Sequence, residues 1–511
     1  MKQHSKSLAG ALSLLLAVLT ALSALTSCTP KSILNSGEQS THESESTYED
    51  PFVDVNYNGR TFCIQTSENS AATGLRSSNY LIQGNDEFCS EPAADAAIKR
   101  NLDVMNRLNI KLVYVPVDYS YETVVSNTRK YLLSGDNSIQ LIINDISLTM
   151  LSAESMFHDA YNGKNFDFDQ PWWYDDFMSD ISLDTHSRYI LAGDYFIDML
   201  RTTHCLVMNR DLYRGVIENG DPDDVYQAVR DGTWTLDYMN SLISGLYIDT
   251  NGNRQRDRSD TYMMSMWQYW GPIIPWIISA DPGFIERDEN GYPVITLNNE
   301  RSASLNEKLN DIFHSRGSAV ELHKDEQDTI NAFVEGRSLF LGYQRFGSLE
   351  SECFANADLD LAVLPYPKLD ENQADYVSSI HDTTELGYIP GSVTYRDMDF
   401  VSAVIEVLCR ETYNQVIPQY YESTLKIRYA REAPNAEMID IIHDHYGNGF
   451  PLAWSGAVPY IFLTSIYEAV LHNNTTFASN FRSHETAARE QIKNLVEDYK
   501  RIEAQRAEAI S

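Results

Sequence analysis

The chain has little positive charge for its size. Its 511 residues include 39 Lys and Arg against 73 Asp and Glu, which gives a formal net charge of −34. Proteins that bind nucleic acid or anionic lipid present basic surfaces, so this balance argues against both classes. Hydrophobic residues make up 43% of the chain and aromatic residues 11%, which is too much for a disordered acidic polymer. The composition therefore indicates a large, acidic, globular protein.

The sequence also lacks the short motifs of common enzyme classes. It contains no HExxH, no GxSxG, no Walker loop and no GxGxxG after a predicted strand. His443, Asp444 and His445 could ligate a metal, but residues two apart on a helix face different ways, so we interpret them as a polar helix end. Paired carboxylates identify no glycosidase in a chain with 73 acids. An enzyme is not excluded, but no motif indicates one.

Long apolar runs are absent after residue 28, and the most apolar later segment, 273–280, is too short to span a bilayer. At the N-terminus, two lysines precede an uncharged run from Leu8 to Leu25, which ends in Leu25-Thr26-Ser27-Cys28. This order is typical of an export signal, and the last four residues match the bacterial lipobox, whose cysteine is lipidated. We therefore expect residues 1–27 to be a lipoprotein signal peptide, with an uncut membrane anchor as the alternative. Cleavage would remove two lysines and no acids, which changes the formal charge from −34 to −36.

Residues 28–50 are mostly Ser, Thr, Glu, Asn and Gln. Such a composition cannot form a core and predicts a flexible tether. A lipid on Cys28 would then hold the folded body at the outer side of the cell membrane.

Cysteine is scarce in the rest of the chain. The five later cysteines show neither a CxxC pair nor zinc spacing, and their odd number leaves at least one unpaired. Cys63, Cys205 and Cys409 lie in apolar runs and are expected to be buried. A disulfide between Cys63 and Cys89 remains an alternative for an exported protein.

The first part of the body predicts an α/β lobe. Strands are expected at 60–65, 110–117 and 139–143, and helices at 93–108 and 121–133. This βαβαβ alternation indicates a parallel sheet. Ligands bind such sheets beyond the carboxyl ends of the strands, where Asn144 and Asp145 follow the third strand.

A second lobe and a helical final third follow. Strands are expected at 205–208 and 361–364, and a helix at 235–246, with Thr235 as its N-cap and Asp237 in its first turn. Later helices are expected at 400–416, 435–443 and 458–472, and a last amphipathic helix carries an apolar stripe from Ile492 to Ile502.

Residues 249–260 have a spacing that resembles an EF-hand calcium loop. Oxygen-bearing side chains fall at positions 1, 3, 5, 9 and 12, and calcium gathers six to eight oxygens. Against calcium, position 6 is Arg254 instead of Gly and position 12 is Asp instead of Glu. A polar turn is the alternative, and bound calcium would be structural. The candidate ligands are Asp249, Asn251, Asn253, Gln255, Asp257 and Asp260.

All seven tryptophans lie beyond residue 170. Sugars bind proteins by stacking on aromatic faces and by hydrogen bonds to carboxylates, amides and arginine. An acidic, aromatic-rich, exported protein therefore fits a neutral carbohydrate ligand, although core packing is the alternative for most of these rings.

Several short motifs, taken in their order along the chain, resemble those of one protein family. The chain resembles the extracellular solute-binding lipoproteins of bacterial ABC importers, in their carbohydrate-type branch, over nearly all of residues 51–511. The order and spacing of the matching segments carry the resemblance. Besides the lipobox they are Arg100-Asn101, Asn109-Ile110-Lys111, 232–237, 249–262, 333–340, 364–368 and 420–426.

This resemblance implies a two-lobed periplasmic-binding-protein-like α/β fold with a hinge and a largely helical C-terminal part. Lobe 1 would comprise 51–204 and about 386–432, and lobe 2 would comprise 205–385 and about 433–511. The implied ligand contacts are Asn144, Asp145, Arg201, Tyr269, Trp270, Tyr343, Phe346 and Trp454.

The function that the resemblance implies is binding without catalysis. A monomeric, membrane-tethered receptor would capture a neutral solute, expected to be an oligosaccharide, between its lobes and deliver it to an ABC permease. No cofactor would be required, apart from the structural calcium considered above. The alternatives are a secreted glycan-active enzyme and a sensor or adhesin with no transport role.

Overall fold

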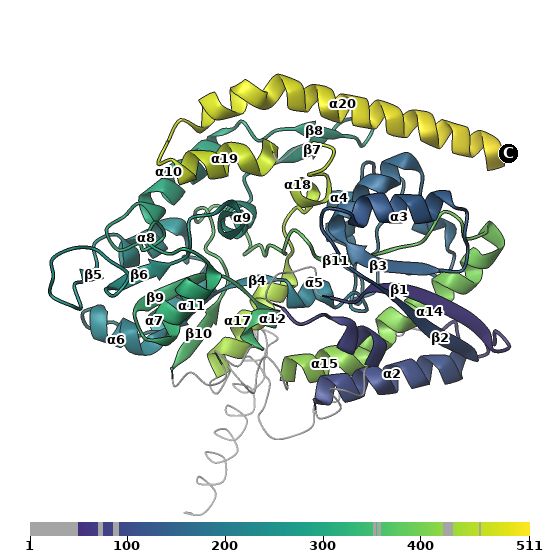
Figure 1. The fold of residues 1–511 in the computed structure, drawn as a ribbon, viewed down its shortest axis with the longest axis horizontal. Coiled ribbons are helices and arrows are strands. Elements are labelled where there is room, and N and C mark those ends of the chain that lie inside the picture. Colours follow the sequence, from purple (N-terminus) through teal and green to yellow (C-terminus); the bar gives the residue numbers. More distant parts are fainter. Residues whose placement is uncertain are drawn as a thin grey trace, which may run out of the picture. The chain divides into compact units, whose positions relative to one another are not determined.

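The sheet of the first lobe has the strand order β11-β3-β1-β2 (Figure 1). The strands β1 (Arg60–Ser67), β2 (Ile110–Val117) and β3 (Leu141–Asp145) are parallel, and β11 (Glu385–Tyr388) is antiparallel to β3. The connecting helices are α2 (Pro92–Leu108) and α3 (Val124–Leu133). The predicted βαβαβ start is thus confirmed. β3 extends past Ile143 because Asn144 and Asp145 pair with β11.

The structure is a computed structural model that describes residues 50–69, 75–84, 91–350, 354, 359–422, 433–458 and 461–510. The expected signal peptide, Cys28, nearly all of the expected tether and Cys89 lie outside the described residues. Among the described residues, no helix combines the length and apolar character needed to cross a membrane.

Local sequence features explain where α2 begins and ends. Pro92 occupies its first turn, where no intrahelical N–H bond is lost, and Asp95 lies near the positive end of the helix dipole. Asn109 ends the helix with a left-handed φ of 48°, a conformation that Asn tolerates better than most residues. Ala93, Ala94, Ala97, Val104 and Leu108 of this helix are buried. α14 (Met398–Glu411) packs against α2 and returns the chain to the first lobe.

The segment between β3 and the second lobe belongs to the first lobe. Leu191 forms a β-bridge with Gly387 of β11, and Trp172 and Trp173 donate hydrogen bonds to Glu406 of α14. The helix α4 (Asp175–Ile181) lies in this segment. Its other short elements are η3 (Ile146–Glu154), η4 (Ala160–Asn162) and α5 (Asp198–Arg201).

The sheet of the second lobe has the strand order β10-β4-β9-β6-β5. β6 and β9 are parallel, and β4 is antiparallel to both β9 and β10. Thr235 caps α8 by accepting the N–H of Tyr238 at 3.2 Å, which confirms the predicted cap. The strands are β4 (His204–Asn209), β5 (Tyr247–Ile248), β6 (Thr261–Ser265), β9 (Ser338–Arg345) and β10 (Leu361–Leu364). The helices are α6 (Arg210–Val216), α7 (Asp223–Arg230), α8 (Leu236–Ile243), α9 (Trp270–Ser279), α10 (Glu300–Phe313), α11 (Glu326–Val334) and α12 (Phe346–Leu349).

A hairpin projects from the second lobe between α9 and α10. It consists of β7 (Ile285–Arg287) and β8 (Pro293–Ile295), which pair antiparallel. Phe284 at its base contacts Phe462 of the later helix α19 (Ile461–Leu471), with ring centroids 6.2 Å apart.

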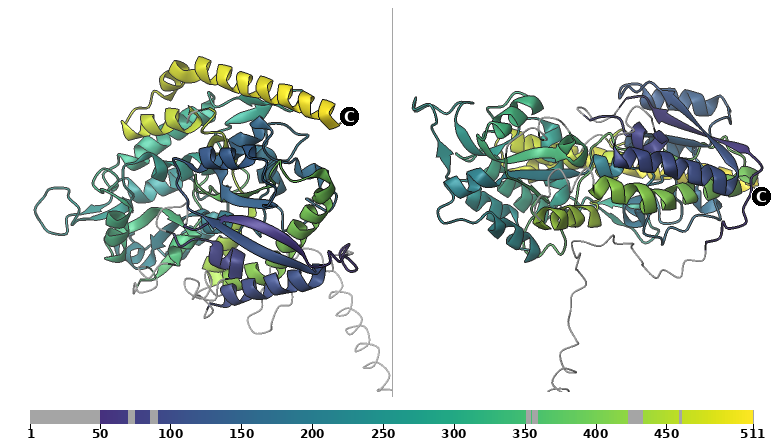
Figure 2. Two further views of the ribbon diagram at one scale, coloured as in Figure 1. Left: turned by 45° about the vertical axis from the view of Figure 1, so that its right-hand side comes forward. Right: turned by 90° about the horizontal axis from the view of Figure 1, so that it is seen from below.

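The final third is mostly helical, as predicted. The long last helix α20 contacts α19 and α10, and also η3 and β8, so it touches elements of both lobes (Figures 1 and 2). The C-terminal helices are α17 (Ala433–Asp444), α18 (Phe450–Ala453), α19 (Ile461–Leu471) and α20 (Phe477–Ile510). The remaining short elements are η1 (Tyr80–Gly84), η5 (Tyr395–Asp397), η6 (Thr412–Val416) and α15 (Ile417–Gln419).

Three chain segments lie side by side where the two lobes join. Thr203 forms a β-bridge with Ile380, and the N–H of His204 donates to the Ser379 carbonyl at 2.8 Å. Ser378 in turn forms a bridge with Tyr446. We call 198–204, 378–385 and 445–450 the crossing segments.

Candidate functional site

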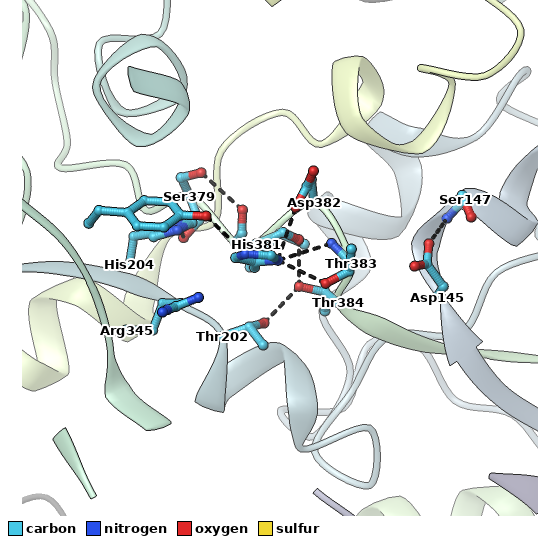
Figure 3. A network of polar contacts seen from close by, with 12 residues as sticks. Asp145, Ser147, Thr202, His204, Arg345, Ser379, His381, Asp382, Thr383 and Thr384 are labelled. Carbon is cyan, nitrogen blue, oxygen red and sulfur yellow. Dashed lines mark hydrogen bonds and ion pairs between the residues drawn. The ribbon is translucent and has the colours of Figure 1, made fainter. Parts of the chain in front are cut away.

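The functional edges of the two sheets are connected by one crossing segment. Glu385 at the start of β11 pairs with Asp145 at the end of β3, which places both at the carboxyl edge of the first sheet. In the second sheet His204 pairs with Arg345 at the end of β9. Residues 380–385 run from the second edge to the first. Figure 3 shows the polar side chains that gather at this junction.

Tyr343, His381 and Asp382 form a connected row at the junction. The Tyr343 hydroxyl lies 3.0 Å from His381 Nε2, and His381 Nδ1 lies 3.0 Å from an Asp382 carboxylate oxygen. The same Nδ1 lies 2.9 Å from the Thr383 hydroxyl. The row therefore links a strand of the second lobe to the segment that leads into the first.

The backbone and surroundings of Tyr343 are unusual. Its φ of 60° lies in the left-handed region, which costs a residue with a side chain about 1–3 kcal/mol and concentrates at functional sites. His204 stacks on its ring at 5.2 Å, and Trp267 meets it edge-on at 5.0 Å. Burial raises the pKa of Tyr343, so its hydroxyl stays neutral. Burial, followed by the charges of His381 and Arg345, lowers the pKa of His204 well below its usual value.

Two aromatic side chains lie next to this row at the start of α9. Tyr269 is 51% exposed and Trp270 is partly exposed, with ring centroids 5.6 Å apart. Gly271 follows them, and a Cβ there would lie 3.3 Å from the Tyr343 hydroxyl. The lack of a side chain at Gly271 thus leaves that hydroxyl beside the aromatic pair.

Asn144 and Asp145 lie at the sheet edge where the sequence predicts them, but both are buried. Asp145 accepts the Tyr119 hydroxyl at 2.6 Å and the Ser147 N–H at 2.7 Å. Burial raises the pKa of Asp145, while these hydrogen bonds oppose the rise. Asn144 accepts the N–H of Asp145 at 2.8 Å. In this conformation both side chains hold the strand end in place.

Three other predicted contacts lie in the interior. Arg201 is completely buried and forms a bidentate ion pair with Glu350, at 2.9 Å for each arm. Phe346 is completely buried on α12, and Trp454 is 1% exposed and donates its N–H to the Ile181 carbonyl at 2.8 Å. The structure thus brings Tyr269, Trp270 and Tyr343 together. The side chains of Arg201, Phe346 and Trp454, by contrast, are held in interior contacts. Their contact with a ligand stays a prediction.

Sequence reasoning missed His204, Trp267, His381 and Asp382. The sequence does carry one signal. His381-Asp382 shortly precedes the segment Leu386 to Ile389, which forms most of β11, as Asn144-Asp145 ends the apolar strand β3. The pairing of these two strands could not be read from one sequence.

The loop at 249–260 folds into a series of turns that its own side chains stabilise. Asp249 accepts the N–H groups of Gly252 and Arg254, at 2.7 and 2.8 Å. The amide nitrogens of Asn251 and Asn253 lie 3.2 and 2.7 Å from Asp257. Rotating these amides by 180° would turn two oxygens toward the Asp257 carboxylate. Two amide oxygens and a carboxylate together are donors of the kind that calcium prefers.

The backbone and side-chain contacts of this loop bear on metal binding. Arg254 takes the left-handed φ of 63° that position 6 requires, so the missing Gly does not prevent the turn. No cluster of three or more His, Cys, Asp or Glu side chains is placed to hold a metal within the described ranges. Asp260 is buried and accepts the Thr250 N–H at 3.1 Å, and the Gln255 N–H donates to Asn253 at 2.6 Å. Calcium binding stays a prediction.

Other expectations concern burial. Cys205 and Cys409 are buried as predicted, whereas Cys63 is a partly exposed free thiol. Five tryptophans are at most 5% exposed, which confirms core packing for most of these rings, and Trp267 and Trp270 are the partly exposed ones.

His443 lies in the last turn of α17, and its ring is 3.4 Å from the Tyr174 hydroxyl. Burial lowers the pKa of His443 to about 4.

Comparison with solved structures identifies the fold. The cyclic α-maltosyl-1,6-maltose binding protein from Arthrobacter globiformis is 13% identical, with a TM-score of 0.55, over 85% of this chain and 100% of that chain. The chain has the fold of the solute-binding proteins. A cyclo/maltodextrin-binding protein complexed with maltotetraose is 10% identical, with a TM-score of 0.50, over 87% of this chain and 97% of that chain. No family model and no curated protein matches the chain. The predicted two-lobed α/β fold is confirmed, and the two structures named here are binding proteins.

Proposed function

We propose that the chain is a solute-binding receptor that captures a neutral oligosaccharide at the junction of its two lobes. The observation that carries this proposal is the pair Tyr269 and Trp270 beside the Tyr343–His381–Asp382 row. A pyranose ring has apolar C–H faces that stack on aromatic rings and an equatorial rim of hydroxyls that needs polar partners. Both kinds of group lie next to one another here.

The charge of the junction supports a neutral ligand. The side chain of Asp382 is 17% exposed. Its negative charge contributes to raising the pKa values of Tyr119, Asp145 and Tyr343. The chain as a whole has a formal charge of −34. An anionic solute would meet repulsion in approach. At the site Asp382 would repel it, while the cation Arg345 is already paired with Glu326 at 2.6 Å.

The fold supplies a mechanism for capture. The crossing segments connect the two sheets, and a rotation about them would close Tyr269 and Trp270 of the second lobe over a solute held at the edge of the first. A solute that contacts both lobes favours the closed form by its differential affinity for that form. The closed form would then dock on an ABC permease.

The setting of this receptor is part of the proposal. A lipid on Cys28 would anchor a monomer at the outer face of the cell membrane, and the loop at 249–260 would take up a structural calcium ion. No catalytic step is assigned. Asp145 and Glu385, the paired carboxylates at the sheet edge, are at most 1% exposed and so are withheld from a substrate.

A thermal-shift screen followed by calorimetry tests the proposal. The screen uses the full chain and a panel of neutral oligosaccharides that includes maltotetraose, together with uronic acid oligomers and peptides. We expect a neutral oligosaccharide to raise the melting temperature, since a ligand that binds only the folded state stabilises it. Trp270→Ala should abolish the shift and leave the melting temperature of the free protein nearly unchanged. Binding of peptides or uronic acid oligomers in place of neutral sugars would contradict the proposal.

A further inference from the structure

A second set of contacts joins the lobes and involves none of the crossing segments. The hairpin β7–β8 belongs to the second lobe, since it connects α9 to α10. Its Arg287 nevertheless reaches α4 of the first lobe. Arg287 Nη2 lies 3.0 Å from the Ser179 carbonyl, 3.0 Å from the Asp180 carbonyl and 2.7 Å from the Ser182 carbonyl.

The chemistry of this contact is that of a helix C-cap supplied by another lobe. The last turn of a helix leaves carbonyl groups without intrahelical partners, and a cation there also meets the negative end of the helix dipole. Arg287 is also attracted to the Asp180 carboxylate. Burial raises the pKa of Asp180 to about 6, and the positive charge of Arg287 opposes this rise. The hairpin tip packs closely too, because a Cβ on Gly291 would lie 2.5 Å from the Thr185 hydroxyl.

The C-terminal helix α20 fastens the hairpin and the first lobe together. Toward the hairpin, Arg489 donates to the Ile295 carbonyl at 3.1 Å, and Lys500 Nζ lies 3.8 Å from the centre of the Tyr292 ring. Toward the first lobe, the Tyr499 hydroxyl donates to Asp184 at 2.8 Å, and Glu503 accepts the Tyr189 hydroxyl at 2.7 Å.

We propose that hairpin β7–β8 and α20 form an inter-lobe clasp, which restrains opening of the lobes and has to release the Arg287 contact before they part. The crossing segments are connections of a few residues each, and lobes joined in this way can rotate about them. The clasp adds polar contacts at a second place, so opening costs the free energy of those contacts. The rate at which a solute enters would then depend on clasp release. This inference concerns the motion on which the proposed capture depends, but its test needs no solute.

The chain offers a matched pair of variants for the test. Arg301 also donates to carbonyl groups, those of Asp281 at 3.1 Å and Ala280 at 3.0 Å, but both lie in its own lobe. Arg287→Met and Arg301→Met therefore remove similar guanidinium–carbonyl contacts and keep much of the side-chain volume. Only the first crosses between lobes.

Small-angle scattering and hydrogen exchange of the full chain without ligand read out the effect. Arg287→Met should enlarge the radius of gyration and speed amide exchange in 198–204 and 378–385 by about tenfold, since hydrogen bonds to charged groups are strong. Arg301→Met should leave both at their original values. A second variant, Tyr499→Phe, deletes one hydroxyl without loss of packing and should shift both readouts in the same direction, by less.

Two outcomes would overturn the clasp. In one, Arg287→Met speeds exchange only at 179–182 and in the hairpin, which would reduce Arg287 to a local helix cap. In the other, Arg287→Met and Arg301→Met change the crossing segments equally, which would assign the effect to general destabilisation. Neither outcome bears on whether a sugar binds, so the clasp and the proposed function fail separately.

Discussion

Arg201, in the crossing segment 198–204, and Glu350 face each other in a bidentate ion pair, with both N–O distances 2.9 Å. The Tyr420 hydroxyl donates to the same carboxylate at 2.7 Å, and Arg201 also donates to Ser78 at 2.7 Å. Arg201 is fully buried and the Glu350 side chain is 10% exposed. The pair thus holds the base of α12 against the first lobe.

Breaking this pair should destabilise the fold strongly. Arg201→Met leaves the Glu350 carboxylate buried without its principal cation, which typically costs about 3–5 kcal/mol. The comparison is Arg129→Met, because Arg129 pairs with Glu154 at 2.6 Å but both side chains are about one-third exposed. That variant should cost about 0–1 kcal/mol. Urea unfolding measures both free energies, and equal losses would contradict the role given to burial.

Glu406 predicts a pH dependence of stability. Burial raises its pKa to about 7, although Trp172 and Trp173 donate to it at 2.8 and 2.9 Å. The folded state therefore holds a proton that the unfolded chain releases near pH 4.5. Its contribution to stability is fully present below about pH 4.5 and is lost as the pH rises to about 7, by roughly 3 kcal/mol at most.

Glu406→Gln should remove this part of the slope. The amide oxygen still accepts an indole N–H, but no charge forms as the pH rises. Urea unfolding at pH 5, 6 and 8 should show a smaller loss of stability for the variant than for the original chain. Parallel curves for the two proteins would refute the assignment.

The junction residues predict a loss of sugar affinity. Tyr343→Phe deletes the hydroxyl that contacts His381 and faces Gly271, so the oligosaccharide that gives a thermal shift should bind about 3- to 12-fold more weakly. Tyr226→Phe is the control. The buried hydroxyl of Tyr226 donates to Asn435 at 2.6 Å, and this hydrogen bond lies outside the junction. It should lower stability and leave the affinity intact. Calorimetric titration of both variants with that sugar separates the two effects.

The loop at 249–260 predicts a response to calcium. If its oxygens bind the ion, calcium at a hundred times its dissociation constant should stabilise the fold by about 2.7 kcal/mol. Asp257→Ala removes the carboxylate on which Asn251 and Asn253 converge and should abolish the response.

A control for the calcium experiment lies in the hairpin. Asp288 accepts the N–H groups of Asn290 and Tyr292, at 2.8 and 2.9 Å, and so makes comparable turn contacts outside the loop. Asp288→Ala should keep the calcium response. An unchanged melting temperature of the original chain across a calcium titration would leave the loop as a polar turn.

Local patterns predicted local structure well. The strand–helix alternation before residue 145 and the Thr235 cap depend on neighbours within a few residues, and the structure confirms both. The ion pair of Arg201 joins residues 149 positions apart, and the contact of Tyr343 with His381 spans 38. Such contacts depend on which strands pair and where the chain crosses between lobes. This is why Arg201 could be predicted near the junction while its partner could not.

The uneven placement of the tryptophans gives the molecule an optical signal of its own. Five indole rings are buried, and two of them, Trp172 and Trp173, donate to the Glu406 carboxylate. Their fluorescence should be a constant background when a solute binds. Trp267 and Trp270 are the two that remain partly open to water, and both lie at the junction. Solute uptake should therefore shift the emission maximum to shorter wavelength without any attached dye, and Trp270→Phe should reduce that shift.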